Sequence, residues 1–201
     1  MSVRPAPSRG DSRATVVPLL ALLRQATAAH HRRLDAGLAL GCATLTRERY
    51  AAFLEGSLRV LLVLEPALRP WPAAYDASPR IECLREDLRA LDADADPARP
   101  PIDVPVDVAG AFGAAYVVEG SALGGRVLAP MVQRVLGAST SVSYLRLRGE
   151  ATQPHWTAWL ARLRTFDEGA RPGDRDVCCA MACATFGAYT RSLTQAMQVA
   201  A

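Results

Sequence analysis

The chain has 201 residues, of which 50% are hydrophobic and 21% charged, and this composition is typical of a globular protein rather than a disordered one. The net charge is only +3 and the 23 basic residues, all arginine, form no basic tract, which argues against a nucleic-acid partner. No apolar run reaches the roughly 18 residues of a membrane span, which argues against a membrane protein. Residues 1–14 have the composition of a disordered leader, so the folded domain is expected over residues 15–201.

The sequence predicts about six helices and no strand, in a single all-α domain. The first helix is expected over residues 17–35 and the second over residues 46–68, where Thr46 can cap the first turn. The third helix is expected in SPRIECLREDLRAL, with Ser78 as its cap and Pro79 as its first residue.

The second half of the chain predicts three more helices. A fourth is expected over residues 106–136 and contains the stretch YVVEGSALGG. Residues 137–152 have loop composition, and a fifth helix is expected in PHWTAWLARLRTF. The sixth is expected over residues 174–197. The segments between these helices have turn composition rather than linker length, which favours one domain over two.

The cysteine content favours a reducing compartment. There are five cysteines, an odd number, and no CxxC pair, and we interpret them as reduced core residues of a cytoplasmic protein. The five are Cys42, Cys83, Cys178, Cys179 and Cys183.

The first helix carries a histidine with charged neighbours on one flank. On a helical wheel centred on the buried face, His31 lies about 40° from the centre, with Arg24 and Asp35 slightly further out on the same side. His30 lies on the opposite shoulder. An imidazole between an orienting carboxylate and an anion-binding arginine suits a metal or haem site. A partly buried histidine beside solvated charges is the alternative, and His155 is expected to be structural.

The fourth helix places glycines on one face. Gly113, Gly120 and Gly124 lie within about 40° of each other, with Tyr116 beside them. Glycine inside a helix costs roughly 0.5–1 kcal/mol relative to alanine, and glycines on one face let the helix backbone approach a neighbouring group closely. Close packing against another helix and contact with a flat ligand are the two alternatives.

Two motifs together resemble the haem oxygenase family, especially its bacterial, biliverdin-forming branch. They are LLRQATAAHHRRLD near the start and YVVEGSALGG past mid-chain, and the resemblance extends over about residues 17–197. It implies an all-helical fold that holds haem between a proximal helix and a bent distal helix. It also implies oxidative opening of haem to biliverdin, CO and Fe²⁺, in which haem is both cofactor and substrate.

The resemblance assigns roles on the first helix. His31 matches the iron ligand, and Asp35 matches the acid that orients it, although Asp is shorter than the family's usual Glu, so a looser or water-carried hydrogen bond is expected. Arg24 and Thr27 match the haem-binding motif, with Arg24 as a propionate anchor. Ala28 replaces a second basic residue found in some relatives.

The resemblance also assigns the opposite wall of the site. Gly120 and Gly124 match glycines whose backbone touches the haem face, and Ser121, in the place of an Asp of animal-type enzymes, joins them in the catalytic set. Tyr116 matches a tyrosine that reaches a propionate, and Phe186 matches an aromatic that walls the pocket. Two arginines further along the chain are candidates for the remaining propionate contacts, Arg162 and Arg191.

The expected partners are haem, O₂ and an electron donor, either a reductase or a ferredoxin, with a functional link to a bilin photoreceptor. The main competing hypothesis is a non-catalytic haem carrier on the same fold. A second hypothesis is a TenA-like hydrolase that uses a cysteine of the Cys178–Cys179 pair, and a third is a plain helical interaction module.

Overall fold

The computed structural model describes residues 17–38, 43–93 and 100–199, and the proposed leader lies outside these ranges. Within them the chain forms six α-helices and one short 3₁₀ turn, with no strand, so the all-α fold class is confirmed. None of the described helices combines the length and apolarity needed to cross a membrane. The elements are α1 (Leu19–Leu38), α2 (Arg47–Leu68), α3 (Arg80–Ala90), α4 (Val108–Leu136), η1 (Gly149–Ala151), α5 (Thr152–Glu168) and α6 (Asp174–Val199).

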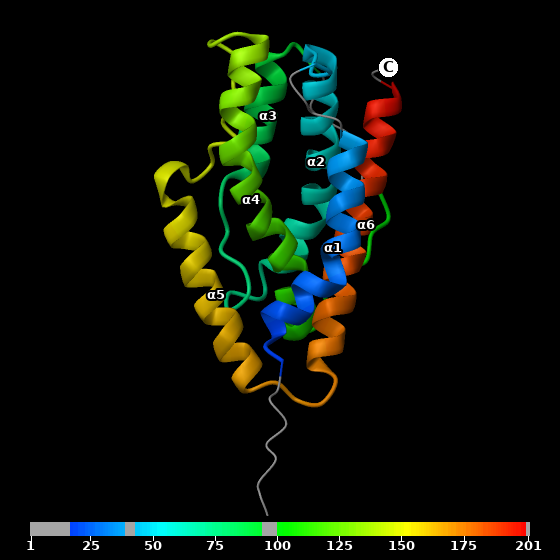
Figure 1. Ribbon diagram of the computed structural model, residues 1–201, viewed down its shortest axis with the longest axis vertical. Helices are drawn as coiled ribbons and strands as arrows, with labels where there is room; N and C mark the ends of the chain where they lie inside the picture. Colours follow the sequence, from blue (N-terminus) through cyan, green and yellow to red (C-terminus); the bar gives the residue numbers. More distant parts are fainter. Residues whose placement is uncertain (1–16, 39–42, 94–99, 200–201) are drawn as a thin grey trace, which may run out of the picture.

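Helix α6 is the common neighbour of three other helices, since α1, α2 and α4 all pack against it. Helix α3 packs on α2, and α5 lies along the far side of α4 from α6 (Figure 1). Each of the five longest helices contributes a buried residue to one core, for example Leu23, Leu58, Phe112, Trp159 and Leu193. The removal of these side chains from water is the main stabilising term, at about 1.5–3 kcal/mol for a fully buried large apolar side chain.

The helix ends show which sequence signals determine the boundaries. The Thr46 hydroxyl accepts from the backbone N–H of Arg49, as the sequence predicted for α2, and Asp107 accepts from the N–H of Gly110 to cap α4. The first helix begins at Leu19 and extends three residues beyond the predicted end, to Leu38.

The predicted cap of α3 was wrong. The helix begins at Arg80 without a side-chain cap, and Pro79 precedes it instead of opening it. The Ser78 hydroxyl instead accepts from the guanidinium of Arg80, which is 1% exposed and also donates to Glu119. A buried arginine needs acceptors for its donors, and this demand outweighs the capping preference of Ser78.

The cysteines of α6 argue against the catalytic-cysteine hypothesis. Cys178 is fully buried, Cys83, Cys179 and Cys183 are half-buried, and all four are free thiols, as expected, while Cys42 lies outside the described residues. Burial raises the pKa of each of these four thiols, and most strongly that of Cys178. A thiol that resists ionisation is a poor nucleophile.

We therefore expect Cys178 to resist iodoacetamide at pH 8 in the native protein and to react after denaturation. Cys178 is buried whereas Cys179 is half-buried, so the thiol of Cys178 is less accessible and more strongly held in its protonated form. Its native alkylation is therefore expected to be about tenfold slower than that of Cys179 or slower still. Mass spectrometry of peptides taken during the reaction measures both rates. Native modification of Cys178 at the rate of Cys179 would contradict the assignment of Cys178 to the core.

Candidate functional site

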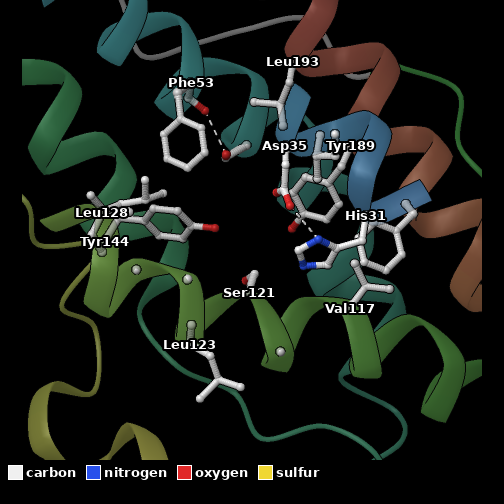
Figure 2. A pocket seen from close by; sticks show the side chains of 18 of the residues that line it. His31, Asp35, Phe53, Val117, Ser121, Leu123, Leu128, Tyr144, Tyr189 and Leu193 are labelled. Carbon is white, nitrogen blue, oxygen red and sulfur yellow. Dashed lines mark hydrogen bonds and ion pairs between the residues drawn. The ribbon is translucent and has the colours of Figure 1, made fainter. Parts of the chain in front are cut away.

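A cavity of about 400 Å³ opens between α1 and α4. Helix α1 forms one wall and α4 the opposite wall, and a third wall comes from residues 144–147, which follow α4 in the chain. Side chains of α2 and α6 close the inner end. Figure 2 shows His31 and Asp35 on one side of this space, with Ser121 and Tyr144 across from them.

The α1 wall carries the predicted ligand and its predicted acid. His31 and Asp35 both line the cavity, and His31 Nδ1 lies 2.8 Å from Asp35 Oδ2. The expectation of a looser or water-carried bond was therefore wrong, because the i,i+4 spacing brings even the short aspartate within direct reach. A carboxylate only accepts, so this bond keeps the proton on Nδ1 and leaves the Nε2 lone pair free for a ligand.

The two other predicted residues of α1, Arg24 and Thr27, differ in their position relative to the cavity. Arg24 is exposed at the cavity wall, on the same side as His31. Thr27, in contrast, is 3% exposed and is not on the wall, and its hydroxyl donates to the Leu23 carbonyl one turn earlier at 2.7 Å. Thr27 therefore serves α1 itself in this structure, since a hydroxyl committed to its own helix backbone has no proton left for a ligand.

The glycines of α4 differ in what lies beside them, although they belong to one continuous helix. A Cβ at Gly113 would lie 2.2 Å from the carbonyl oxygen of Cys178, so this glycine permits close packing of α4 on α6. A Cβ at Gly125 would lie 2.4 Å from the carbonyl oxygen of Leu145. The helix-packing interpretation therefore holds at Gly113, whereas Gly125 packs against the segment that follows α4. Neither position can accept a side chain without backbone movement.

Gly120 and Gly124 line the cavity without such a backbone contact, whereas Gly125 both lines the cavity and packs against Leu145. A Cβ at Gly120 would make only ordinary contact with Trp156, at 3.6 Å, and a Cβ at Gly124 would meet nothing within 4 Å. No neighbouring atom of the described chain requires glycine at these positions. The absence of side chains there therefore keeps the α4 backbone accessible from the cavity.

A buried ionic cluster behind α4 fixes which face of the helix points at the cavity. Glu119, the residue before Gly120, is 1% exposed and accepts from Arg80 at 2.7 Å and from His155 at 2.9 Å. Arg148 lies 3.5 Å from the same carboxylate. Removing one partner of a buried pair costs about 3–5 kcal/mol, so Glu119 resists rotation of α4 about its axis. His155 thus has the structural role that the sequence predicted.

The third wall depends on a carboxylate of α3. Asp87 is fully buried, and its Oδ1 accepts from the Ser141 hydroxyl at 2.6 Å and from the Ser143 N–H at 2.8 Å. Its Oδ2 accepts from the Tyr144 N–H at 2.9 Å. These bonds hold an otherwise irregular segment in place and direct the Tyr144 side chain into the cavity (Figure 2).

The two aromatic residues predicted for the site are on the cavity wall. Tyr116 is half-buried between the cavity and two tryptophans of α5. The ring of Phe186 lies 5.8 Å from that of His31, measured between centroids, so it limits the movement of the imidazole.

The two arginines proposed for further propionate contacts are not on the wall. Arg162 donates to both carboxylate oxygens of Asp76, at 2.9 and 2.6 Å, and Arg191 is exposed on α6. This bidentate pair with Asp76 occupies both terminal guanidinium nitrogens of Arg162, which are then not available to a propionate. The hydrogen bond from Arg162 also lowers the pKa of Asp76.

Sequence reasoning missed three hydroxyl-bearing residues of the site. They come from α2, from the segment after α4, and from α6, and all line the cavity: Ser57, Tyr144 and Tyr189. Burial raises the pKa of both tyrosines, so both remain protonated at neutral pH. No periodicity or motif connects residues so far apart in the chain, and only the fold brings them together.

Known proteins resemble this chain in both sequence and structure. No protein-family model matches it. It is 36% identical over 118 residues to a haem oxygenase of Xanthomonas campestris pv. campestris (strain 8004), across 56% of this chain and 70% of that protein. Its fold is similar to that of the NO- and CO-bound haem oxygenase from Neisseria meningitidis, with a TM-score of 0.73 and 19% identity, over 91% of this chain and 94% of that one.

Proposed function

Because the chain belongs to the haem oxygenase family, we propose that it opens the haem ring oxidatively to give biliverdin, CO and Fe²⁺. The observation that carries the proposal is the pairing of two walls across one cavity. His31 with its acid stands on α1, and the open backbone at Gly120 and Gly124 faces it from α4.

The residues present fit a haem. A haem would need a wide slot with an imidazole nitrogen to hold its iron on one wall and an accessible backbone on the other. The Nε2 of His31 is the free imidazole nitrogen, and a Cβ at Gly124 would project into open space that a haem face requires. The positive charge of Arg24 at the wall suits a propionate, and Tyr116 offers a hydroxyl for another.

Haem supplies both the iron that activates O₂ and the carbon ring that is cut. The contribution of α1 is to hold and orient. His31 is the proposed iron ligand, and Asp35 fixes its tautomer and its ring orientation through the 2.8 Å bond to Nδ1. Phe186 packs beside the imidazole and limits its rotation.

The contribution of α4 is a wall without strong acids or bases. None of its residues that line the cavity carries a carboxylate, an imidazole or a guanidinium. The Ser121 hydroxyl donates to the Val118 carbonyl at 2.8 Å, so its proton is committed and its lone pairs accept. With a haem bound, this wall would offer no charged acid or base beside the macrocycle, which would favour oxidation of the ring itself.

The reaction needs electrons, and we propose that a separate reductase or ferredoxin supplies them. The reduced cysteines suit the cytoplasm as the site of the reaction. A bilin photoreceptor is the proposed consumer of biliverdin.

The test is haem addition to the purified protein, followed by a reductant and O₂. We expect a histidine-ligated haem spectrum that converts to the absorption of biliverdin, with CO released in equal amount. Haem that binds without ring opening would indicate a carrier, and a protein that binds no haem would exclude both functions.

A further inference from the structure

The start of helix α1 is held by a side chain of α5. The backbone N–H of Leu19, the first residue of α1, donates to Asp167 Oδ2 at 2.9 Å, across 148 positions of the sequence. Helix α1 supplies no such acceptor of its own, because Pro18 precedes it and its first turn contains no acidic residue. Leu19 is fully buried, and a buried N–H without an acceptor is costly. Asp167 therefore takes the place of the missing N-cap.

The same carboxylate also reaches α6. Arg175 Nε lies 2.7 Å from Asp167 Oδ1, in an ion pair that lacks the angle of a hydrogen bond. The Asp167 side chain is only 12% exposed, and a negative charge beside the start of a helix is favoured by the helix dipole. Asp167 thus joins the end of α5 to the first turns of α1 and α6, which lie together at one end of the bundle (Figure 1).

The preceding residue of α5 contacts the opposite wall of the cavity. The ring of Phe166 stacks on that of Phe112 in α4, with 4.5 Å between their centroids. Phe112 lies about one turn before Tyr116 of the cavity wall, and Leu19 lies shortly before Arg24 of the facing wall. Both contacts are therefore made just beyond one end of the cavity, from which α1 and α4 run in the same direction (Figure 1). Two consecutive residues of α5 hold the two walls at this end.

Other packing fixes α1 less completely than it fixes the remaining long helices. Helix α1 lies along α6 and touches α5, and no other described helix contacts it over a comparable length. A packed apolar seam resists separation of two helices, but it specifies their position along the seam less sharply than a hydrogen bond to a fixed acceptor does. The position of α1, and of the His31 that it carries, therefore depends on how its first turn is held.

We propose that Asp167 is a positioning residue for haem, because it fixes α1 and His31 at the separation from α4 at which haem fits. The inference rests on the proposed function, since it assumes that His31 ligates haem in the slot between α1 and α4. Asp167 does not line the cavity, and it acts along α1 from Leu19, about 18 Å from His31 at 1.5 Å per residue. The bond from the Leu19 N–H carries the effect, and Arg175 holds the carboxylate in place for it.

Asp167→Ala and Asp167→Asn separate this role from a general loss of stability. Alanine removes the acceptor, whereas asparagine keeps an oxygen that caps a helix about as well as aspartate does. We expect Asp167→Ala to speed the transfer of ferric haem to apomyoglobin about tenfold, and Asp167→Asn to stay within about threefold of the parent. In the protein without haem, hydrogen exchange of the backbone amides of α1 is expected to become faster in Asp167→Ala, relative to the amides of α6.

Asp174→Ala is the matched control, because the Asp174 carboxylate accepts from the Arg171 N–H at 2.8 Å and so serves the turn between α5 and α6. Both alanine variants lose one bond from a carboxylate to a backbone N–H at the same end of the bundle, and thermal unfolding is measured for each. Only Asp167→Ala is expected to release haem faster.

Haem transfer at the same rate in Asp167→Ala and Asp174→Ala would overturn the inference, and so would Asp167→Asn that behaves like Asp167→Ala. Fast transfer confined to Asp167→Ala supports it. A parent protein that takes up no haem would instead reject the proposed function, while the amide exchange would still show whether Asp167 holds α1.

Discussion

His31→Ala is expected to lose the histidine-ligated haem spectrum and all biliverdin formation. The Nε2 of His31 is the only free imidazole nitrogen on the described cavity wall, so its removal leaves the iron without a protein ligand on that side.

Asp35→Asn is expected to retain ligation and to lower haem affinity or activity about 10–100-fold, because the amide cannot orient the imidazole as the carboxylate does. Absorption spectra and biliverdin assays measure both effects.

His30→Ala is the matched control, since His30 is the adjacent imidazole of the same helix but does not line the cavity. It is expected to keep both the spectrum and the activity. Added imidazole is expected to restore the spectrum of His31→Ala by entering the space that the side chain leaves. Loss of ligation in His30→Ala with retention in His31→Ala would reverse the ligand assignment.

Gly124→Leu is expected to lower the rate of ring opening about a hundredfold while leaving the fold intact. The new side chain would occupy open space on the cavity side of α4, where a small displacement of the substrate is enough to cost that factor. Gly124→Ala is expected to raise the free energy of unfolding by up to about 1 kcal/mol, since alanine favours a helix and its Cβ meets no neighbour.

The opposite pattern is expected elsewhere on the same helix, at the two glycines that pack against backbone. Gly113→Ala forces a Cβ against the Cys178 carbonyl, and Gly125→Ala forces one against the Leu145 carbonyl. Each is expected to lower the free energy of unfolding by about 1–3 kcal/mol, as overpacking does. Chemical denaturation and haem titration together separate the two classes. A Gly124→Ala protein that is as unstable as Gly113→Ala would refute the conclusion that Gly124 has open space beside it and Gly113 does not.

The sequence could predict the angular position of each glycine on α4 but not its neighbour along the axis. Gly113 and Gly120 lie at nearly the same angle because they are seven residues apart. Seven residues also separate them by about 10 Å along the helix, at 1.5 Å per residue. Over that distance the neighbour changes from the α6 backbone to the cavity. One face of α4 therefore packs against a helix at Gly113 and is open to a ligand at Gly120, and these were the two alternatives that the sequence left open.

Long-range partners account for the parts that the sequence did not predict. The prediction of Ser78 as the cap of α3 was wrong because Ser78 bonds to Arg80, which is itself paired with Glu119, 39 residues further along the chain. The sequence did not predict Tyr144 as a site residue because it lies outside the helices and is positioned by Asp87, 57 residues earlier. In contrast, His31 and Asp35 could be recognised because their contact is local, at i,i+4 on one helix.

The Asp87 anchor has an evolutionary consequence. One wall of the cavity is a segment without regular structure that is tied to the helical bundle by the Asp87 carboxylate, by a hydrogen bond from Tyr50 to the Ser141 carbonyl, and by the buried side chains of Val142 and Leu145. Changes of sequence beyond Leu145, the last buried residue of this segment, can therefore reshape the space beside the substrate while the bundle that carries His31 and the α4 glycines stays as it is. Selection can thus adjust the shape of this wall through a few residues outside the helices.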